Sequence, residues 1–200
     1  KAKAVTSIAM FYDLERPIDF MRDIHDVLAD DGVWLLEQSY LPSMLEMNAY
    51  DTVCHEHLEY YGLRQIKWMA DRVGLKIVDV ELNMVNGGSF AVTLAKSGSN
   101  HRENLDLVEK ILGDEESRGL ETLAPYHEFG QRVEDHKADL RGLIGRIKAS
   151  GESILGLGAS TKGNVILQYC GLTEEDIPSI AEVNQDKFGR LTPGTHIPII

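Results

Sequence analysis

The sequence predicts an α/β protein with two parts, each built around parallel strands. Residues 4–37 alternate as strand, helix and strand, and residues 153–183 repeat that order after a charged helical stretch. A helix between two strands of a short unit is typical of a parallel crossover. The run from Ser97 to Asn100 has the small, polar composition of a linker. We therefore expect one domain over residues 1–97 and a second over residues 101–200.

The first strand–helix–strand unit follows from its apolar pattern. Residues 4–11 form an apolar run of strand length, and apolar residues recur at helical spacing after Pro17, which suits a first helical turn. We expect Asp31 and Gly32 to end this helix and residues 33–37 to form a buried strand.

The rest of the first domain is predicted to close the sheet. Residues 63–73 have helical spacing and are followed by Gly74, a common helix terminator. Residues 76–82 and 89–95 alternate as strands around an Asn-Gly-Gly turn, so we expect an antiparallel hairpin at the sheet edge. Residues 38–62 show no regular period and are predicted to be irregular.

The second domain is predicted to begin with helices and to end in a Rossmann-like unit. Residues 104–112 and 126–148 are helical and charged outside an apolar stripe. Residues 153–157 are predicted as a strand, 158–163 as a small-residue turn, 164–170 as a helix and 177–183 as a second strand. This order is half of a Rossmann-like βαβ arrangement.

Composition excludes several classes of protein. The formal net charge of −12 over 200 residues argues against non-specific nucleic-acid binding, because a phosphate backbone would be repelled. No apolar run approaches the roughly 20 residues that span a bilayer. Cys54 and Cys170 lie far apart, and no signal peptide leads the chain, so we expect a reduced, cytoplasmic protein. Strand-like residues reach both ends, so we also expect a longer parent chain.

Titratable side chains concentrate between residues 50 and 61, where His55, Glu56 and His57 are adjacent. A carboxylate beside an imidazole can orient it as a general base, and loops on a rigid scaffold often carry chemistry. Two other interpretations stay open. The run could be a hydrogen-bonded surface loop, or His-x-His with a carboxylate could bind a metal, although no third ligand stands at a compelling spacing.

Five segments, in order, resemble the S-adenosylmethionine-dependent C-methyltransferases of nucleotide-linked sugars. They are SIAMFYDLERP, YDTVCHEHLEYYGL, NGGSF, LGLGASTKGN and LTPGTHIPI. The resemblance implies that the first domain supplies strands four to seven of a seven-stranded methyltransferase sheet, the last one antiparallel. It places most of the methyl-donor site, and a zinc-binding region, before Lys1. Only the strand end at Ser7, Ala9 and Met10 is expected to line the donor pocket.

The resemblance also implies catalytic residues. Glu56 and His57 match the family's Glu-His pair, while Cys54 stands where the family has a tyrosine, and no histidine follows the first strand near Tyr12. We expect His57 to act as base or enolate-stabilising donor, with Glu56 orienting it or binding a sugar hydroxyl. His55 and Tyr12 are second-rank candidates.

The glycine-rich turn at residues 156–163 is the second candidate site. Its backbone N–H groups could bind an anion at a helix N-terminus. It departs from a dinucleotide fingerprint, because Thr161 replaces the third glycine, and from a Walker A loop, because Asn164 follows Gly163. The glycines could also serve only a tight turn. The resemblance favours a nucleotide diphosphate, with these binding candidates: Gly158, Ser160, Thr161, Lys162, Asn164, Glu182, Thr195 and His196.

The predicted function is therefore that of a C-methyltransferase acting beside the ketone of a nucleotide-linked keto-deoxysugar, with this chain alone inactive. An NAD(P)-dependent oxidoreductase and a non-catalytic partner-binding domain are the alternatives. An exposed sheet edge would permit a homodimer. We assign Trp34, Trp68 and Cys170 to the core, His136 to a solvated helix face, and Asp114 to Glu116 to an exposed helix start.

Overall fold

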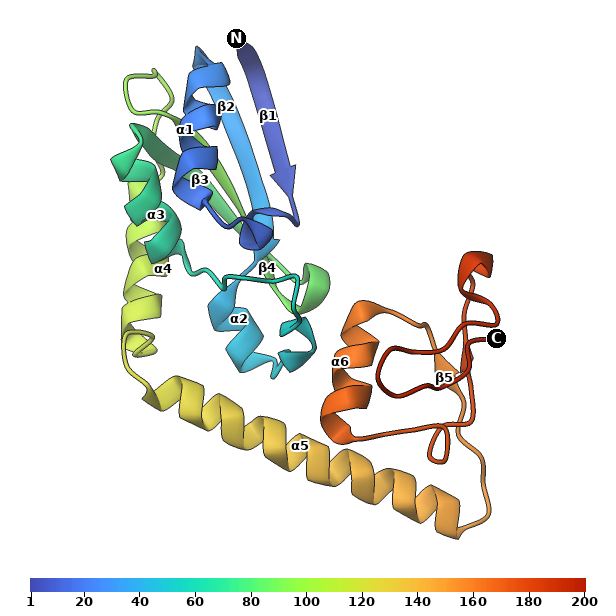
Figure 1. Cartoon of the computed structure of the whole chain (residues 1–200). Coiled ribbons are helices and arrows are strands. Elements are labelled where there is room, and N and C mark those ends of the chain that lie inside the picture. The colour runs from blue at the N-terminus through green and yellow to red at the C-terminus, as the bar shows by residue number, and fades with distance from the viewer. The chain divides into compact units, whose positions relative to one another are not determined.

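The computed structural model describes all 200 residues, which fold as two compact units (Figure 1). The N-terminal unit comprises residues 1–49 and 56–127, and the C-terminal unit comprises residues 50–55 and 128–200. The domain boundary that we predicted at residues 97–101 stays a prediction. None of the helices is both long and apolar enough to span a bilayer.

The N-terminal unit contains a mixed four-stranded sheet. Its strands are β1 (Ala2–Ile8), β2 (Leu28–Ser39), β3 (Leu75–Asn83) and β4 (Ser89–Lys96), in the order β1-β2-β4-β3. β1 runs parallel to β2, whereas β4 runs antiparallel to both of its neighbours. The α/β class and the antiparallel β3–β4 pair are confirmed. The larger seven-stranded sheet stays a prediction.

Three helices accompany this sheet. They are α1 (Pro17–Val27), α3 (Leu63–Arg72) and α4 (Leu105–Ser117). Pro17 opens α1, where its missing N–H costs no hydrogen bond. Gly74 follows α3 with φ +75°, a conformation that glycine adopts without the strain of a β-carbon. The helices predicted from apolar spacing are thus confirmed, and α4 extends beyond the predicted residue 112.

The end predicted for α1 was wrong. The helix ends at Val27, and β2 begins at once with Leu28 and continues through Asp31 and Gly32. The β1–β2 register shifts here, from Ala2 opposite Leu28 to Ala4 opposite Val33. A β-carbon on Gly32 would lie 2.6 Å from the Ala2 carbonyl oxygen. The glycine therefore permits close approach of two strands at an irregularity and does not end a helix.

The core of the N-terminal unit is aromatic at its centre. Phe11 lies 5.9 Å from Trp34 and 5.5 Å from Tyr61 between ring centroids, and Trp34 is fully buried, as predicted. Trp68 was predicted wrongly, because half of its surface is exposed. The Arg72 guanidinium lies 3.4 Å from the centroid of its indole ring, so the tryptophan covers a surface cation instead of filling the core.

The segment predicted to be irregular contains two short elements. They are α2 (Leu41–Glu46) and the single-turn 3-10 helix η2 (Tyr50–Thr52). Two further 3-10 turns are η1 (Phe11–Asp13), directly after β1, and η3 (Val85–Gly87), in the β3–β4 connection. Short turns of this kind lack the repeated apolar spacing on which the sequence prediction depended.

The C-terminal unit contains most of the long helix α5 (Ala124–Ala149) and a small parallel pair of strands. β5 (Gly156–Leu157) and β6 (Ile180–Ala181) flank α6 (Thr161–Cys170), with Gly156 opposite Ile180. A last 3-10 turn is η4 (Gln185–Lys187). The predicted strand–helix–strand order is present, but each strand has two residues where five and seven were expected, so a second Rossmann-like unit stays a prediction. Cys170 is fully buried in this unit's core, as predicted.

Candidate functional site

Tyr12 and His57 lie together at the carboxyl end of β1. Their ring centroids are 4.4 Å apart, and the planes are inclined by 55°. The Tyr12 carbonyl accepts hydrogen bonds from the backbone N–H groups of Leu58 and Glu59, at 3.0 and 3.1 Å. The segment that carries the Glu-His pair is thereby tied to the turn after β1. Two of the four predicted catalytic side chains are thus adjacent, and their roles stay predictions.

The backbone turns sharply at the end of β1, before Tyr12. The N–H of Ala9 donates to the Glu37 carbonyl at 2.8 Å, and Ala9 has φ +52°, a strained conformation for a residue with a β-carbon. Ser7 is buried, and its hydroxyl accepts a 3.0 Å hydrogen bond from the Trp34 indole N–H. Ala9 is exposed and Met10 half-buried, so these two residues are more open to a ligand than Ser7. Ligands of α/β sheets bind at such carboxyl ends.

The chain passes from one unit to the other inside the predicted signature. Cys54 and His55 belong to the C-terminal unit, whereas Glu56 and His57 belong to the N-terminal unit.

No three His, Cys, Asp or Glu side chains are grouped so that they could hold a metal ion. The signature histidines therefore offer no ready metal centre.

Glu115 was missed by the sequence analysis. We expected an exposed helix start at Asp114 to Glu116, but this run lies near the end of α4 and Glu115 is 3% exposed. Its carboxylate accepts hydrogen bonds from the N–H groups of Leu63 at 2.6 Å and Arg64 at 3.0 Å, and from the Tyr40 hydroxyl at 2.9 Å. Burial, and then the Glu115 charge, raise the pKa of Tyr40. Glu115 thus caps α3 from another helix, where a negative charge is favoured.

A pocket of about 770 Å³ lies against α1 and α3 in the N-terminal unit. Its lining is largely apolar, with Trp68 and Met69 among the lining side chains, and it includes three arginines. Two of them, Arg16 and Arg22, pair with Asp19. None of the predicted site residues lines this pocket, and its size alone assigns it no chemistry.

The glycine-rich turn has the conformation expected between a strand and a helix. Gly158 has φ +83°, and its N–H donates to the Ala181 carbonyl at 2.8 Å. Ser160 is the N-cap of α6, since its hydroxyl accepts the Gly163 N–H at 3.1 Å. The helix therefore begins at Thr161, three residues earlier than predicted, and carries Lys162 in its first turn.

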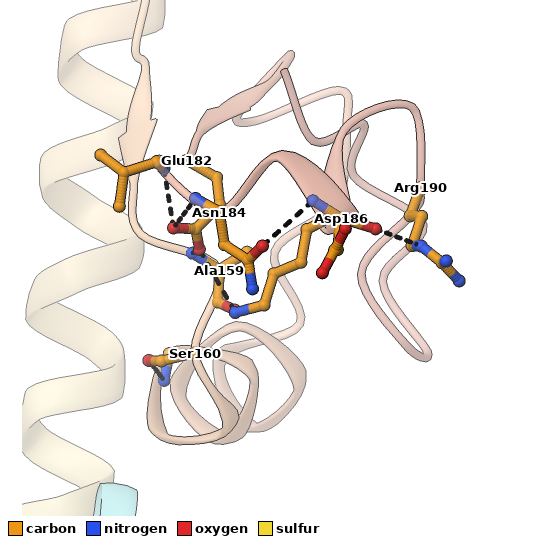
Figure 2. Close-up of polar contacts among 9 residues, drawn as sticks. Ala159, Ser160, Glu182, Asn184, Asp186 and Arg190 are labelled. Carbon is orange, nitrogen blue, oxygen red and sulfur yellow. Dashed lines mark hydrogen bonds and ion pairs between the residues drawn. The ribbon is translucent and has the colours of Figure 1, made fainter.

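Glu182 braces this turn from the end of β6 (Figure 2). Its carboxylate accepts the N–H groups of Ala159 at 2.9 Å, Val183 at 2.8 Å and Asn184 at 3.2 Å. These backbone hydrogen bonds, the one from Ala159 first, lower the pKa of Glu182 to about 2. Lys187 donates to the Ala159 carbonyl at 2.8 Å and lies 3.4 Å from the same carboxylate. The predicted role of Glu182 in nucleotide binding stays a prediction, and a nucleotide hydroxyl would compete with these donors.

The second predicted loop, at Thr195 and His196, lies against α6. The hydroxyls of Thr192 and Thr195 are 2.6 Å apart, and Thr192 also accepts the N–H of Ile197 at 2.8 Å. The Gln168 amide on α6 donates to the Pro193 carbonyl at 3.0 Å. His196 is exposed with φ +56°. One helix thus fixes both the glycine-rich turn and this loop within the C-terminal unit.

Two family models match the chain. Residues 84–200 match a C-methyltransferase C-terminal domain, and residues 1–80 match a methyltransferase domain. The chain is 36% identical over 184 residues to the C-methyltransferase NovU of Streptomyces niveus, covering 88% of this chain and 44% of NovU. It therefore spans less than half the length of this curated relative.

Similarity to solved structures is partial. LepI in complex with S-adenosylmethionine aligns with a TM-score of 0.41 and 13% identity, over 48% of this chain and 26% of LepI. The O-methyltransferase NcsB1 from neocarzinostatin biosynthesis aligns with a TM-score of 0.38 and 14% identity, over 48% of this chain and 29% of NcsB1.

Proposed function

Because the chain belongs to the C-methyltransferase family through the C-terminal domain matched over residues 84–200, we propose that it forms part of an S-adenosylmethionine-dependent enzyme that methylates the carbon beside the ketone of a nucleotide-linked keto-deoxysugar. The observation that carries the proposal is the Tyr12–His57 contact at the carboxyl end of β1. It brings an imidazole from the signature segment to the edge where α/β sheets bind ligands.

The reaction requires a carbon nucleophile. A C–H group beside a ketone is acidic because the charge left on deprotonation moves onto the carbonyl oxygen. A positioned base removes the proton, and hydrogen-bond donors stabilise the enolate oxygen. An imidazole suits the first task, since its ordinary pKa lies near neutrality. His57 is the proposed base or enolate donor. Glu56 orients it or binds a sugar hydroxyl, and Tyr12 and His55 assist.

We propose that the bound methyl donor contacts this chain at Ala9 and Met10. Both residues stand at the carboxyl end of β1, and the left-handed backbone at Ala9 turns the chain there. S-adenosylmethionine supplies the electrophilic methyl group when bound. Ser7 is buried behind them and contributes through its hydrogen bond with Trp34, which fixes the strand end. The zinc-binding region that the resemblance implies lies in the remainder of the parent protein.

The nucleotide of the substrate is proposed to bind at the N-terminus of α6. Ser160 is the N-cap of α6, Thr161 and Lys162 stand in its first turn, and Asn164 follows on the same helix, while Gly158 shapes the turn before it. Thr195 and His196 stand on the loop that the same helix holds. Glu182 supports the turn from behind. Orphan N–H groups at a helix start favour an anion, and a lysine adds positive charge.

Calorimetric titration of the chain tests the nucleotide site. We expect dTDP, UDP, GDP or CDP to bind and S-adenosylmethionine and NADH to bind weakly or not at all. Lys162→Ala should weaken nucleotide binding about tenfold, because charge-assisted contacts to phosphate are strong. The matched control is Lys67→Ala, which removes an exposed lysine of α3 that pairs with Asp71. Equal affinity of both variants and the parent chain would contradict the assignment, and tight NADH binding would favour an oxidoreductase.

Replacement of His57 tests the catalytic assignment. In the complete methyltransferase, His57→Ala should lower kcat by about 10²- to 10⁴-fold, the usual contribution of a general acid or base. His127→Ala is the matched control, because His127 is exposed at the start of α5 in the same unit. The assay follows methyl transfer from labelled S-adenosylmethionine. If both variants retain the parental kcat, His57 has no part in the reaction.

We also propose a cytoplasmic location, which suits the two free thiols Cys54 and Cys170. A homodimer through an open edge of the four-stranded sheet is a further proposal, since β1 and β3 are the two edge strands. Sedimentation velocity of the chain over a range of concentrations tests it.

A further inference from the structure

Tyr50 opens the signature segment and is buried in the C-terminal unit. Only 6% of its surface is exposed, and it begins the single turn η2. Its hydroxyl lies 2.9 Å from Nδ1 of His136 on α5 and 3.6 Å from Sγ of Cys170 on α6. His136, which we had assigned to a solvated helix face, therefore has a partner more than 80 residues away. Burial, followed by the hydrogen bond with Cys170, raises the pKa of Tyr50, so the phenol keeps its proton.

A second tyrosine packs against Tyr50. The Tyr169 ring lies 5.5 Å from that of Tyr50, and its hydroxyl donates to the Glu134 carboxylate on α5. The Lys137 ammonium lies 4.7 Å from the centroid of the Tyr169 ring. These side chains join α5 to α6 around the phenol. Tyr50 thus fills a site formed by two helices that follow it in sequence by more than 70 residues.

The segment that follows Tyr50 is short and has backbone hydrogen bonds of its own. Residues 50–55 are the only part of the C-terminal unit that comes from before residue 128. The N–H of Val53 donates to the Tyr50 carbonyl at 3.0 Å, and that of Cys54 to the Thr52 carbonyl at 3.1 Å. Thr52 is 2% exposed. Two local backbone hydrogen bonds thus connect the turn that begins at Tyr50 with Cys54, the residue before His55.

We propose that Tyr50 is a positioning residue, whose phenol, held between His136 and Cys170, fixes Cys54 and His55 of the signature segment for methyl transfer. The inference rests on the proposed function, because the place of these residues matters to the reaction only if the signature takes part in it. The fixed segment loses little freedom when substrate binds, and such preorganisation raises the rate of the chemical step.

The reactivity of Cys54 measures whether the segment is held. Cys54 is half-exposed and Cys170 is buried, so iodoacetamide labelling followed by peptide mass spectrometry reports the two thiols separately. In the isolated chain, Tyr50→Phe should raise the labelling rate of Cys54 about fivefold, because the variant removes the hydrogen bonds of the phenol with His136 and Cys170 and so favours local opening. Tyr126→Phe is the matched control: Tyr126 also donates one hydrogen bond from a half-buried position, to the Leu120 carbonyl.

Two variants of His136 test the route of the effect. His136→Leu removes the nearer of the two partners of the phenol and should raise Cys54 labelling nearly as much as Tyr50→Phe does. The double variant should show no increase beyond that of Tyr50→Phe. His136→Asn keeps a polar atom near the place of Nδ1 and should restore labelling to within about twofold of the parent chain. Additive effects in the double variant, or no rescue by asparagine, would show that the hydrogen bond does not hold the segment.

Hydrogen exchange separates local positioning from general destabilisation. In Tyr50→Phe, exchange should increase at residues 51–55 and stay unchanged in α6 and β5. Uniformly faster exchange across the C-terminal unit would overturn the proposal in favour of a purely structural role, and unchanged exchange and labelling would overturn it outright.

The complete methyltransferase supplies the functional readout. Tyr50→Phe should lower kcat about fivefold and leave KM for S-adenosylmethionine and the nucleotide affinity unchanged, because loss of the hydrogen bonds of the phenol loosens the signature segment alone. A parental kcat together with faster Cys54 labelling would overturn the functional part of the inference. Failure of the His57 test would instead refute the proposed function, and the two failures are therefore distinguishable.

Discussion

Glu115 in the N-terminal unit and Glu182 in the C-terminal unit do similar work by different means. Each carboxylate accepts backbone N–H groups and so fixes a segment next to a predicted functional loop. Glu115 reaches the start of α3 from about 50 residues away and is almost completely buried. Glu182 binds Ala159 across a two-residue strand pair and otherwise bonds to its own neighbours, with Lys187 beside it. Glu115 makes long-range hydrogen bonds in a core, whereas Glu182 makes mostly local hydrogen bonds near the surface.

Removal of Glu115 should have the largest effect. Glu115→Ala leaves Tyr40, Leu63 and Arg64 with buried donors and no acceptor, which should destabilise the N-terminal unit by about 3 kcal/mol. Urea unfolding followed by tryptophan fluorescence measures this, because both tryptophans belong to that unit. Glu116→Ala, an exposed neighbour, is the control. Equal loss of stability in both variants would show that the hydrogen bonds of Glu115 do not stabilise the N-terminal unit.

Glu115 also marks the limit of prediction from this sequence. The run Asp-Glu-Glu at the end of an apolar helical stripe has the pattern of a solvated face. Its burial depends on Tyr40, Leu63 and Arg64, which arrive from other elements. The spacing of apolar residues within one helix contains no information about such contacts. By contrast, the helices α1, α3 and α4 and the strands β3 and β4 were predictable, because their buried side chains recur at regular spacing.

The candidate site divides in the same way. The glycine-rich turn between β5 and α6 was predictable from its small residues, whereas the brace by Glu182 was not, since it depends on the pairing of β5 with β6. The adjacency of Tyr12 and His57 was likewise beyond local patterns, because 45 positions separate them in the chain. The Asp31-Gly32 error has a related cause: Gly32 lies against the Ala2 carbonyl of the neighbouring strand, a contact between residues far apart in sequence.

Acidification should weaken the hydrogen bonds that the Glu182 carboxylate accepts. The pKa of Glu182 is about 2 in the folded unit against an ordinary value of 4.5, so its stabilising contribution is complete above pH 4.5 and is lost as the pH falls toward 2. The protection of the Ala159 amide, measured as its exchange rate relative to the intrinsic rate at each pH, should therefore fall across this range. In Glu182→Gln the lower protection should be present already at pH 7 and should not change on acidification. A protection factor at Ala159 that is independent of pH in the parent chain would show that the carboxylate does not hold the turn.

Loss of Lys187 should have the smallest effect of the three. The Lys187–Glu182 pair is 3.4 Å long and the lysine is 39% exposed, so the solvent screens the charge interaction. Lys187→Ala should accelerate exchange at Ala159 by less than about threefold, because the backbone hydrogen bonds to Glu182 remain. A larger acceleration would assign the brace mainly to the lysine, through its hydrogen bond to the Ala159 carbonyl.

The C-terminal unit is discontinuous in sequence, and this affects how the protein can be dissected. A truncation that retains only the residues after α4 would contain α5, α6 and the small strands but would lack the six residues that begin with Tyr50. The Cys170 thiol and the Tyr169 ring would lose their contacts with Tyr50, and an oxidisable thiol and apolar surface would be exposed to other molecules. A synthetic peptide with the sequence of residues 50–55 could replace the missing turn. Such a peptide is therefore a candidate ligand for the truncated C-terminal unit.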